Sequence, residues 1–458
     1  MDHKRTLKTL ALVALASIGM ASCQTDSEDE YVEPGATVIT MYAQSFEDWS
    51  NSHLIEMRKK FNSIEDDGIQ LDIKLFEDSV YSDALTSARE NNAAPDIFMI
   101  SYGNIYHDLI VPGYGEPLND LMGEAAIDDI LPNVLDMVSY NGQVYAYPQL
   151  VEPSTLFFYR KSMFATAGVT SAPSTWSDLL SACSKVLPTL RKGQYCLGLP
   201  IGTALGWATY GMQINTTGGL AVNDKWDQCL VDSQGYRDLN GFFYDVYAGG
   251  YCPAGNVSPK GYTDIIEGLC EDKLAMTLAG SWSIAEIVND YPDVLDDIGI
   301  AMIPTADGDA TKCSATNGGW TYAISSSGSN KAKAATVLKW FLSDDTERTA
   351  DFFKAACYSK AAVTKSVQAY LSANVTDEYK DMLAIVNEVS SLAEAEPKYL
   401  WGISTAVGAM FETMAVKCDS SKGDSFRTST VNNAISTAVQ TINSLISASD
   451  YQTNPYLS

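Results

Sequence analysis

Residues 147–153, "YPQLVEP", place a carboxylate within a stretch of bulky and aromatic side chains. Glu152 lies between an Asn-Gly pair at 141–142, which is typical of a hairpin turn, and the run Leu156–Tyr159, which predicts a strand. A carboxylate this close to an apolar core is costly unless another group satisfies it. The sequence therefore marks Glu152 as a residue that needs a specific partner.

Several tryptophans lie beside small or turn-forming residues, where a ring can face open space. Trp282 follows Gly-Ser, Trp320 follows Gly-Gly, Trp401 lies in "KYLWG" and Trp207 lies in "LGWAT". Flat rings stack on the apolar CH faces of sugars while polar groups bind the hydroxyls. Burial in a core is at least as good an interpretation for any one of them. The candidates for ligand contact here are Trp207, Ser281, Trp282, Trp320 and Trp401.

Polar and aromatic side chains also follow predicted strands in the N-terminal part of the chain. Their combination of rings, amides and hydroxyls suits a neutral polyol. These candidates are Tyr42, Gln44, Ser45, Ser101, Tyr102 and Asn104. The "DGDAT" segment at 307–311 lacks the rest of a calcium-binding loop, so we interpret it as a turn and expect neither a metal nor a cofactor.

The elements that must position these residues alternate between strand and helix patterns. Residues 37–43, 69–76 and 96–101 predict strands, and helical patterns at 54–62 and 81–92 separate them. This order predicts a mostly parallel sheet flanked by helices.

The alternation resumes after residue 153. Helices are predicted at 174–187, 263–273, 283–291 and 330–345, with strands at 274–280, 298–304 and 321–326. Thr175 and Asp178 have the spacing of a capping box. Trp176, beside that cap, and Trp340, in an amphipathic helix, are expected in the core.

Two α/β lobes follow from this pattern, each with a mostly parallel sheet. Ligands of open α/β sheets bind beyond the carboxyl ends of the strands, so two facing lobes predict a ligand cleft between them. The first lobe is assigned to residues 36–151 plus 303–345. The second lobe is assigned to residues 152–302 plus 346–458.

The N-terminus has the pattern of a targeting segment. Basic residues precede the apolar run at 10–16, which is too short to span a membrane as a mature helix, and the segment ends in "MASC". The pattern resembles a bacterial lipoprotein signal of residues 1–22, with Cys23 lipidated. Ordinary cleavage near Ala21 is the alternative. Residues 23–35 are acidic and predict a disordered tether.

Charge and cysteine content limit the partners and the compartment. A net charge of −27 repels nucleic acid and anionic membrane surfaces, so we expect neither as a surface partner. An even set of cysteines in an exported chain suggests disulfides, but free buried thiols are an equal alternative. These cysteines are Cys183, Cys196, Cys229, Cys252, Cys270, Cys313, Cys357 and Cys418.

Five segments in order resemble the sugar-binding class of extracellular solute-binding proteins, the lipoprotein receptors of ABC importers to which maltose-binding protein belongs. They are "NNAAPDIFMIS", "GEPLNDLM", "NGQVYAYPQLVEPSTLFFYRKSMFATAGVTSAPSTWSDL", "KLAMTLAGSWSIAEI" and "IGIAMIPTADG" followed by "NGGWTYAISSSGSNKAKAATVLKWFLSDD". The matches cover about 37–345. "LCEDKL" departs from the family pattern, and the C-terminal helical region matches only loosely.

The resemblance implies a periplasmic-binding-protein fold with a Tyr-Pro hinge at Tyr147. It also implies that Glu152 accepts hydrogen bonds from sugar hydroxyls, although a structural salt bridge remains open. The expected function is capture of an oligosaccharide by a monomeric, lipid-anchored receptor outside the cytoplasmic membrane, with delivery to the permease subunits of an ABC transporter.

Other functions remain open. A receptor for a peptide or another small polar solute is the nearest alternative. A secreted glycan-degrading enzyme is less expected, because no G-x-S-x-G or HExxH motif is present. Acidic residues are numerous enough that composition alone does not exclude hydrolysis.

Overall fold

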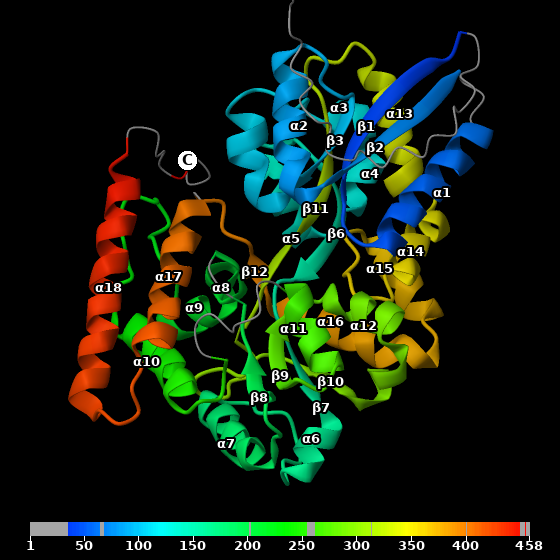
Figure 1. Ribbon diagram of the computed structural model, residues 1–458. Helices are drawn as coiled ribbons and strands as arrows, with labels where there is room; N and C mark the ends of the chain where they lie inside the picture. Colours follow the sequence, from blue (N-terminus) through cyan, green and yellow to red (C-terminus); the bar gives the residue numbers. More distant parts are fainter. Residues whose placement is uncertain are drawn as a thin grey trace, which may run out of the picture.

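The structure is a computed structural model, and it describes residues 35–64, 68–200, 203–253, 262–312, 314–399, 401–448 and 454. The proposed signal, Cys23 and the tether up to residue 34 lie outside the described residues. Within the described part of the chain, no helix combines the length and the apolar character that a bilayer crossing requires. Figure 1 shows two lobes, one above the other, joined near the middle of the molecule.

The first sheet is built on the βαβαβ unit that the sequence predicts. Its elements are β1 (Thr37–Ser45), α1 (Asp48–Ile64), β2 (Ile69–Glu77), α2 (Asp78–Glu90) and β3 (Ile97–Ser101). β1 pairs in parallel with both β2 and β3. Alternate residues of β1 and β2 are buried, as expected for strands with one face on a helix layer. The hydroxyl of Tyr81 in α2 donates to the carbonyl of Met99 in β3, at 2.7 Å, and fixes the helix on the sheet.

β11 (Thr316–Ile324) runs through the middle of this sheet, and Figure 1 shows it passing toward the other lobe. The order is β12-β11-β3-β1-β2, with β6 (Tyr147–Pro153) on the opposite edge of β11 and β12 (Glu394–Ala395) beside its first residues. Gly319 has φ +127°, and a Cβ there would lie 2.6 Å from the carbonyl oxygen of Leu150. A glycine is therefore required where β11 and β6 approach most closely.

The second sheet has the order β10-β7-β9-β8. The strands are β7 (Leu156–Arg160), β8 (Tyr195–Gly198), β9 (Leu274–Ala279) and β10 (Ile298–Ala301). β7 pairs antiparallel with β10 and β9, and β8 pairs parallel with β9. The expectation of a mostly parallel sheet is therefore wrong for this lobe. The reason is that β7 starts at the junction of the lobes, whereas β9 ends there, so Leu156 pairs with Ala279.

The residues between β6 and β7 tie the two sheets together. The Ser154 hydroxyl accepts hydrogen bonds from the backbone N–H and the hydroxyl of Thr316, at 3.0 and 3.1 Å. The Thr155 hydroxyl donates to the carbonyl of Ala208 at 2.6 Å. The lobe boundaries stay a prediction; β12, in the stretch assigned to the second lobe, pairs with the first sheet.

Helices cover both sheets (Figure 1). Around the first sheet lie α3 (Asn119–Met122), α4 (Glu124–Asp129), α5 (Pro132–Val138) and α13 (Lys331–Leu342). The second sheet carries α6 (Lys161–Thr166), α7 (Trp176–Val186), α11 (Tyr262–Cys270) and α12 (Ser283–Asp290). The helices α8 (Thr203–Ala208), α9 (Tyr210–Thr217), α10 (Gln234–Ala248), α17 (Trp401–Lys417) and α18 (Asp424–Ile446) pack together on one side. On the opposite side of the molecule lie α14 (Thr346–Ala355), α15 (Lys365–Asn374) and α16 (Lys380–Leu392).

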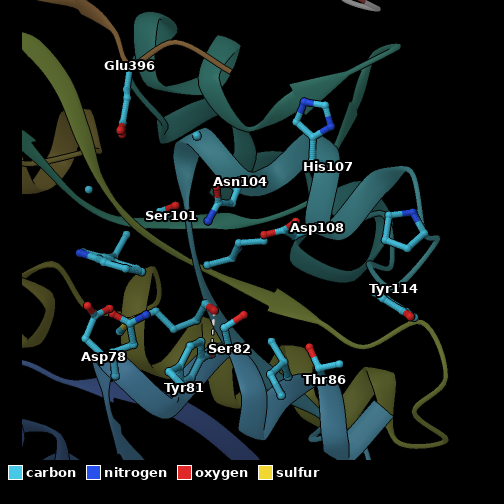
Figure 2. A pocket seen from close by; sticks show the side chains of 18 of the residues that line it. Asp78, Tyr81, Ser82, Thr86, Ser101, Asn104, His107, Asp108, Tyr114 and Glu396 are labelled. Carbon is cyan, nitrogen blue, oxygen red and sulfur yellow. Dashed lines mark hydrogen bonds between the residues drawn. The ribbon is translucent and has the colours of Figure 1, made fainter. Parts of the chain in front are cut away.

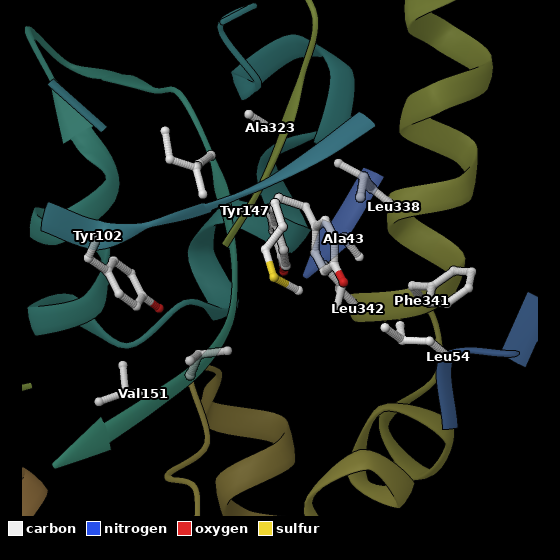
Figure 3. Close-up of a cluster of buried hydrophobic side chains, with 14 of the residues drawn as sticks. Ala43, Leu54, Tyr102, Tyr147, Val151, Ala323, Leu338, Phe341 and Leu342 are labelled. Carbon is white, nitrogen blue, oxygen red and sulfur yellow. The ribbon is translucent and has the colours of Figure 1, made fainter. Parts of the chain in front are cut away.

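Two large apolar cores underlie this arrangement. Figure 3 shows part of the first, with Tyr147 near Ala43 of β1 and Leu342 of α13, and with Tyr102 and Val151 on the side away from α13. Trp340 is buried in this core, as predicted. Trp176 packs on Phe242 in the second core, with ring centroids 4.9 Å apart.

Two local predictions are also confirmed. Thr175 and Asp178 form a capping box at the start of α7. Asn141 and Gly142 both have positive φ in the hairpin between β4 (Ser139–Tyr140) and β5 (Gln143–Val144).

The described cysteines carry free thiols, which agrees with the second of the two alternatives. They are Cys183, Cys196, Cys229, Cys252, Cys270, Cys357 and Cys418. Cys313 lies outside the described residues. Burial raises the pKa of the Cys252 thiol well above its usual range, as expected for a thiol without a nearby cation.

Candidate functional site

A cavity of about 850 Å³ lies beyond the carboxyl ends of β1 and β3 and reaches into the space between the lobes. One wall is a face of α2, from Asp78 to Arg89, and the opposite wall is the helical segment 102–110 that follows β3. The inner end is closed by β6, β11, α8 and the segment after β12. Figure 2 shows Asp78, Ser82 and Thr86 facing Asn104 and Asp108 across this space.

The outer end of the cavity combines the Arg89 cation with the ring of Tyr114 and the carboxyl group of Asp108. The Arg89 guanidinium lies over the rings of Phe98 and Tyr114, at 4.7 and 4.1 Å from their centroids. Burial raises the pKa of Asp108, while His107 and Arg89 lower it. Burial also lowers the pKa of His107, which favours the neutral imidazole.

The inner end is rich in aromatic rings. Trp207 of α8 packs against Trp282, with ring centroids 5.5 Å apart, and Trp320 of β11 packs against Phe46 at 4.9 Å. Trp320 lines the cavity, whereas Phe46 lies outside its lining and is 40% exposed.

Glu396 projects into the cavity from the segment after β12 (Figure 2). Its Oε1 atom accepts a hydrogen bond from the indole N–H of Trp207 at 2.5 Å. Burial raises the pKa of Glu396 to about 7, Trp207 lowers it and the nearby Glu152 carboxylate raises it further. At neutral pH this carboxyl group is therefore divided between its protonated and charged forms.

Glu152 lines the same end of the cavity, at the end of β6. Its carboxylate forms an ion pair with Lys360, and the two residues are only 9% and 6% exposed. The Lys360 ammonium also lies 5.9 Å from the ring centroid of Trp282. The salt-bridge interpretation of Glu152 is thus present in the structure, alongside its position on the cavity wall.

The structure brings six of the predicted contact residues together on the cavity wall. They are Gln44, Ser101, Asn104, Glu152, Trp207 and Trp320. Gln44 is 7% exposed, and its Oε1 atom has no hydrogen-bond partner. Buried polar atoms are nearly always satisfied, so an unsatisfied acceptor on a cavity wall indicates a place for a donor.

Other predicted residues do not line this cavity. The rings of Tyr102 and Tyr147 are buried, and their hydroxyls donate to the carbonyls of Leu150 and Ala126. Tyr42 packs on Phe76, at 4.8 Å between ring centroids.

Ser45 accepts a hydrogen bond from the Asn51 amide at 2.9 Å. Ser281 is fully buried, and Trp282 packs against Trp207 without lining the cavity itself. Trp401 begins α17, but the description does not extend to its side chain, and Cys23 lies outside the described residues.

Several cavity residues were not expected from the sequence, notably Arg89, Tyr399 and Glu396. A signal for Glu396 exists: it precedes Pro397, as Glu152 precedes Pro153. Proline disfavours the α conformation at the preceding residue, so both glutamates are held in extended segments.

Comparison with known proteins agrees with this architecture. The family model described as "Bacterial extracellular solute-binding protein" matches residues 54–348. A mannitol-binding protein of Pseudomonas aeruginosa is 28% identical over 235 residues, which cover 50% of this chain and 52% of that protein. An uncharacterised ABC transporter extracellular-binding protein of Pyrococcus horikoshii is 22% identical over 203 residues, 43% of this chain and 46% of that protein. The chain thus matches about half the length of these curated relatives.

Solved structures show the same two-lobe fold over nearly the whole molecule. An ABC transporter solute-binding protein of Thermotoga lettingae, bound with α-D-tagatose, superposes with a TM-score of 0.69 at 21% identity, covering 90% of this chain and 100% of that chain. A maltose-bound protein of T. maritima gives 0.70 at 18% identity, covering 89% and 99%. The family model and the shared fold confirm the resemblance drawn from the five sequence segments. This chain belongs to the bacterial extracellular solute-binding protein family.

Proposed function

We propose that the protein is the carbohydrate-binding receptor of an ABC importer. It captures a sugar, an oligosaccharide by preference, in the cavity between its lobes and delivers it to the permease subunits. The observation that carries this proposal is the composition of the cavity wall. Aromatic side chains at Trp207 and Trp320 share this wall with the unsatisfied acceptor of Gln44 and the ionisable carboxyl group of Glu396.

The chemistry of this wall suits a sugar. Rings bind the apolar CH faces, and acceptors bind the hydroxyl donors. A volume of about 850 Å³ lies within the usual range for small-molecule sites and leaves room for more than one sugar ring. The named ligands of the similar proteins, which include mannitol, tagatose and maltose, are sugars or polyols.

Capture by hinge closure is part of the proposal. The cavity takes its walls from both sides of the lobe junction: α2 and β3 on one side, α8 on the other. Rotation about the segment at Ser154 and Thr155 would bring these walls together around a ligand, as in other two-lobe receptors. Trp282, Trp401 and Ser281 are proposed to reach the ligand only in the closed form.

A binding screen on the mature chain tests this function. Thermal unfolding should be measured with maltose, maltotriose, cellobiose, mannitol and tagatose, and hits should be quantified by calorimetry. A ligand at 100 times its Kd stabilises the native state by about 2.7 kcal/mol, so a true ligand gives a clear upward shift. If no sugar, oligosaccharide or polyol shifts the transition and a peptide library does, the carbohydrate assignment is wrong.

Lipid anchoring at Cys23 and a monomeric state belong to the same proposal. They rest on the sequence, because Cys23 lies outside the described residues. Fatty-acid labelling of the wild type, absent in Cys23→Ala, would support the anchor; equal labelling of both would contradict it.

One observation favours a second candidate, a glycan-degrading enzyme. Glu152 and Glu396 both line the inner end of the cavity, and the raised pKa of Glu396 is what a general acid requires. The screen separates the two functions: a receptor recovers its ligand intact after incubation, whereas an enzyme releases shorter sugars.

A further inference from the structure

The cavity contains more acidic side chains than its cations balance. Asp78, Asp108, Glu152 and Glu396 all line it. A carboxylate in a partly desolvated site is stabilised by a cation, by hydrogen-bond donors or by a helix N-terminus. The four carboxylates differ in which of these stabilising groups lies beside them.

Three of the four are compensated by the protein itself. Glu152 is ion-paired with Lys360. Burial raises the pKa of Asp108 overall, but His107 and the Arg89 guanidinium lie close enough to oppose that shift. Asp78 is in the first turn of α2, where the positive end of the helix dipole favours a negative charge.

Glu396 differs from the other three. Its single hydrogen bond from a described side chain is the one from Trp207, and among the described residues no basic nitrogen lies within ion-pair distance of it. The groups that act on its charge are burial, that indole N–H and the repulsive Glu152, with no cation among them. Among the described residues, the charged form of the Glu396 carboxyl group therefore has a hydrogen-bond donor but no counter-charge.

The surroundings of Glu396 favour a cation over a neutral donor. A Cβ at Gly318 would lie 2.8 Å from its Oε2 atom, so glycine keeps that side of the carboxylate clear. Trp207 and Trp320 provide ring faces in the same end of the cavity, and ring faces attract ammonium groups. Gln44 adds a further acceptor without a partner. An ammonium group supplies three donors and the missing positive charge.

We propose that the ligand carries a positively charged amine, as in an amino sugar, and that Glu396 is the residue that binds the amine between Trp207 and Trp320. This inference rests on the proposed function, because it names the class of carbohydrate that the same cavity takes. It assigns Glu396 a role in specificity: the carboxylate discriminates a protonated amine from a hydroxyl or an acetamide at the same position of the sugar.

The test compares three matched β-1,4-linked series of one to four units: glucosamine oligomers, N-acetylglucosamine oligomers and cello-oligosaccharides. They differ only in the amine, acetamide or hydroxyl at one carbon. Affinities are measured by calorimetry at pH 7 on the mature chain. We expect the best glucosamine oligomer to bind at least tenfold more tightly than its neutral counterparts, the factor expected for one charge-assisted hydrogen bond. Its affinity should fall as the salt concentration rises.

Two variants assign the preference to the residue. Glu396→Gln keeps the shape and the acceptor but removes the charge, so the ratio of amine to neutral affinities should fall to about one. Glu394→Gln removes the same charge two residues earlier, from an exposed side chain outside the cavity, and should keep the ratio of the wild type.

The outcomes separate this inference from the proposed function. If neutral oligomers or other neutral sugars bind and the amine is not preferred, the cationic ligand is wrong while the carbohydrate receptor stands. If the amine is preferred equally by wild type and Glu396→Gln, Glu396 does not bind it. If none of the three series binds, the amino-sugar inference is overturned, and the wider sugar screen alone decides the carbohydrate function.

Discussion

Two glutamates, each followed by proline, flank the same part of β11 on its opposite edges. Glu152 ends β6 and pairs with Gly318, whereas Glu396 follows β12 and its backbone N–H donates to the carbonyl of Asn317 at 2.9 Å. Both side chains line the inner end of the cavity. Their partners differ: Glu152 has the Lys360 ammonium, and Glu396 has an indole N–H.

This difference in partners suggests different roles for the two glutamates of the cavity, a structural one for Glu152 and a ligand-binding one for Glu396. A buried ion pair is already satisfied and gains little by meeting a ligand, whereas a carboxylate without a cation remains a strong acceptor. The family resemblance selects Glu152 for ligand contact. In the structure, however, it is Glu396 whose carboxylate can still accept a hydrogen bond from a cationic group. Under the proposed role of Glu396, charge recognition lies on the β12 side of β11 and charge compensation on the β6 side.

Breaking the Glu152–Lys360 pair should have the largest effect. Lys360→Met leaves the Glu152 carboxylate buried without a counter-charge, and removing one partner of such a pair typically costs about 3–5 kcal/mol of unfolding free energy. Chemical denaturation at pH 7 measures the loss. Glu152→Gln combined with Lys360→Met should recover most of it. If Lys360→Met costs less than about 1 kcal/mol, the pair behaves like an exposed one and the comparison with Glu396 fails.

Glu396→Gln, which removes the carboxylate without a counter-charge, should raise the free energy of unfolding, and the gain should depend strongly on pH. The folded-state pKa of Glu396, about 7, lies above its ordinary value of 4.5. The wild type therefore loses stability as the pH rises through this window, by at most roughly 3 kcal/mol between pH 4.5 and pH 8. Glu396→Gln cannot ionise, so it should lose less over this range and be the more stable protein at pH 8.

Denaturation curves at pH 5, 6, 7 and 8 check this expectation. Glu286 of α12, whose pKa burial raises to about 8, titrates in both proteins and therefore cancels in the difference. Glu394→Gln provides the matched control and should follow the wild type at every pH. Parallel curves for wild type and Glu396→Gln would mean that Glu396 is as well solvated as an ordinary surface acid.

Much of the first lobe could be predicted from local patterns. Period-two alternation of apolar residues identified β2, and the Asn-Gly pair identified the hairpin at Asn141. In the second lobe, residue spacing identified the capping box of α7. These features depend on neighbours within a few residues, so the sequence expresses them directly. The antiparallel pairing of β7 with β9 was missed because burial patterns carry no information about strand direction.

The site was harder to predict for the same reason. Glu152 and Lys360 are 208 residues apart, and Trp207 and Glu396 are 189 apart, so no local pattern connects either pair. Tyr102 and Tyr147 have the residue type of sugar-binding side chains, but both rings turn into the first core, as Figure 3 shows. Gln44, Asn104 and Trp320 were found because each lies at or just beyond a strand end, or on the strand that crosses between the lobes.

The smallest expected effect on stability comes from removing the Trp207 indole N–H, which donates the side-chain hydrogen bond to Glu396. Trp207→Phe keeps a ring against Trp282 but removes the indole N–H, which lowers the pKa of Glu396 in the wild type. The pKa should therefore rise above 7. At pH 8 the free energy of unfolding of the variant should be roughly 1 kcal/mol below that of the wild type, and at pH 5 this difference should be absent. The reason is that the indole N–H binds the charged carboxylate more strongly than the protonated carboxyl group.

A double-mutant cycle with Glu396→Gln isolates this coupling from the change of ring size. Trp282→Phe, cycled against the same Glu396 substitution, should show no such pH-dependent coupling, because the indole N–H bonded to Glu396 is that of Trp207. Equal coupling at pH 5 and pH 8 would show that the charge of Glu396 does not depend on Trp207.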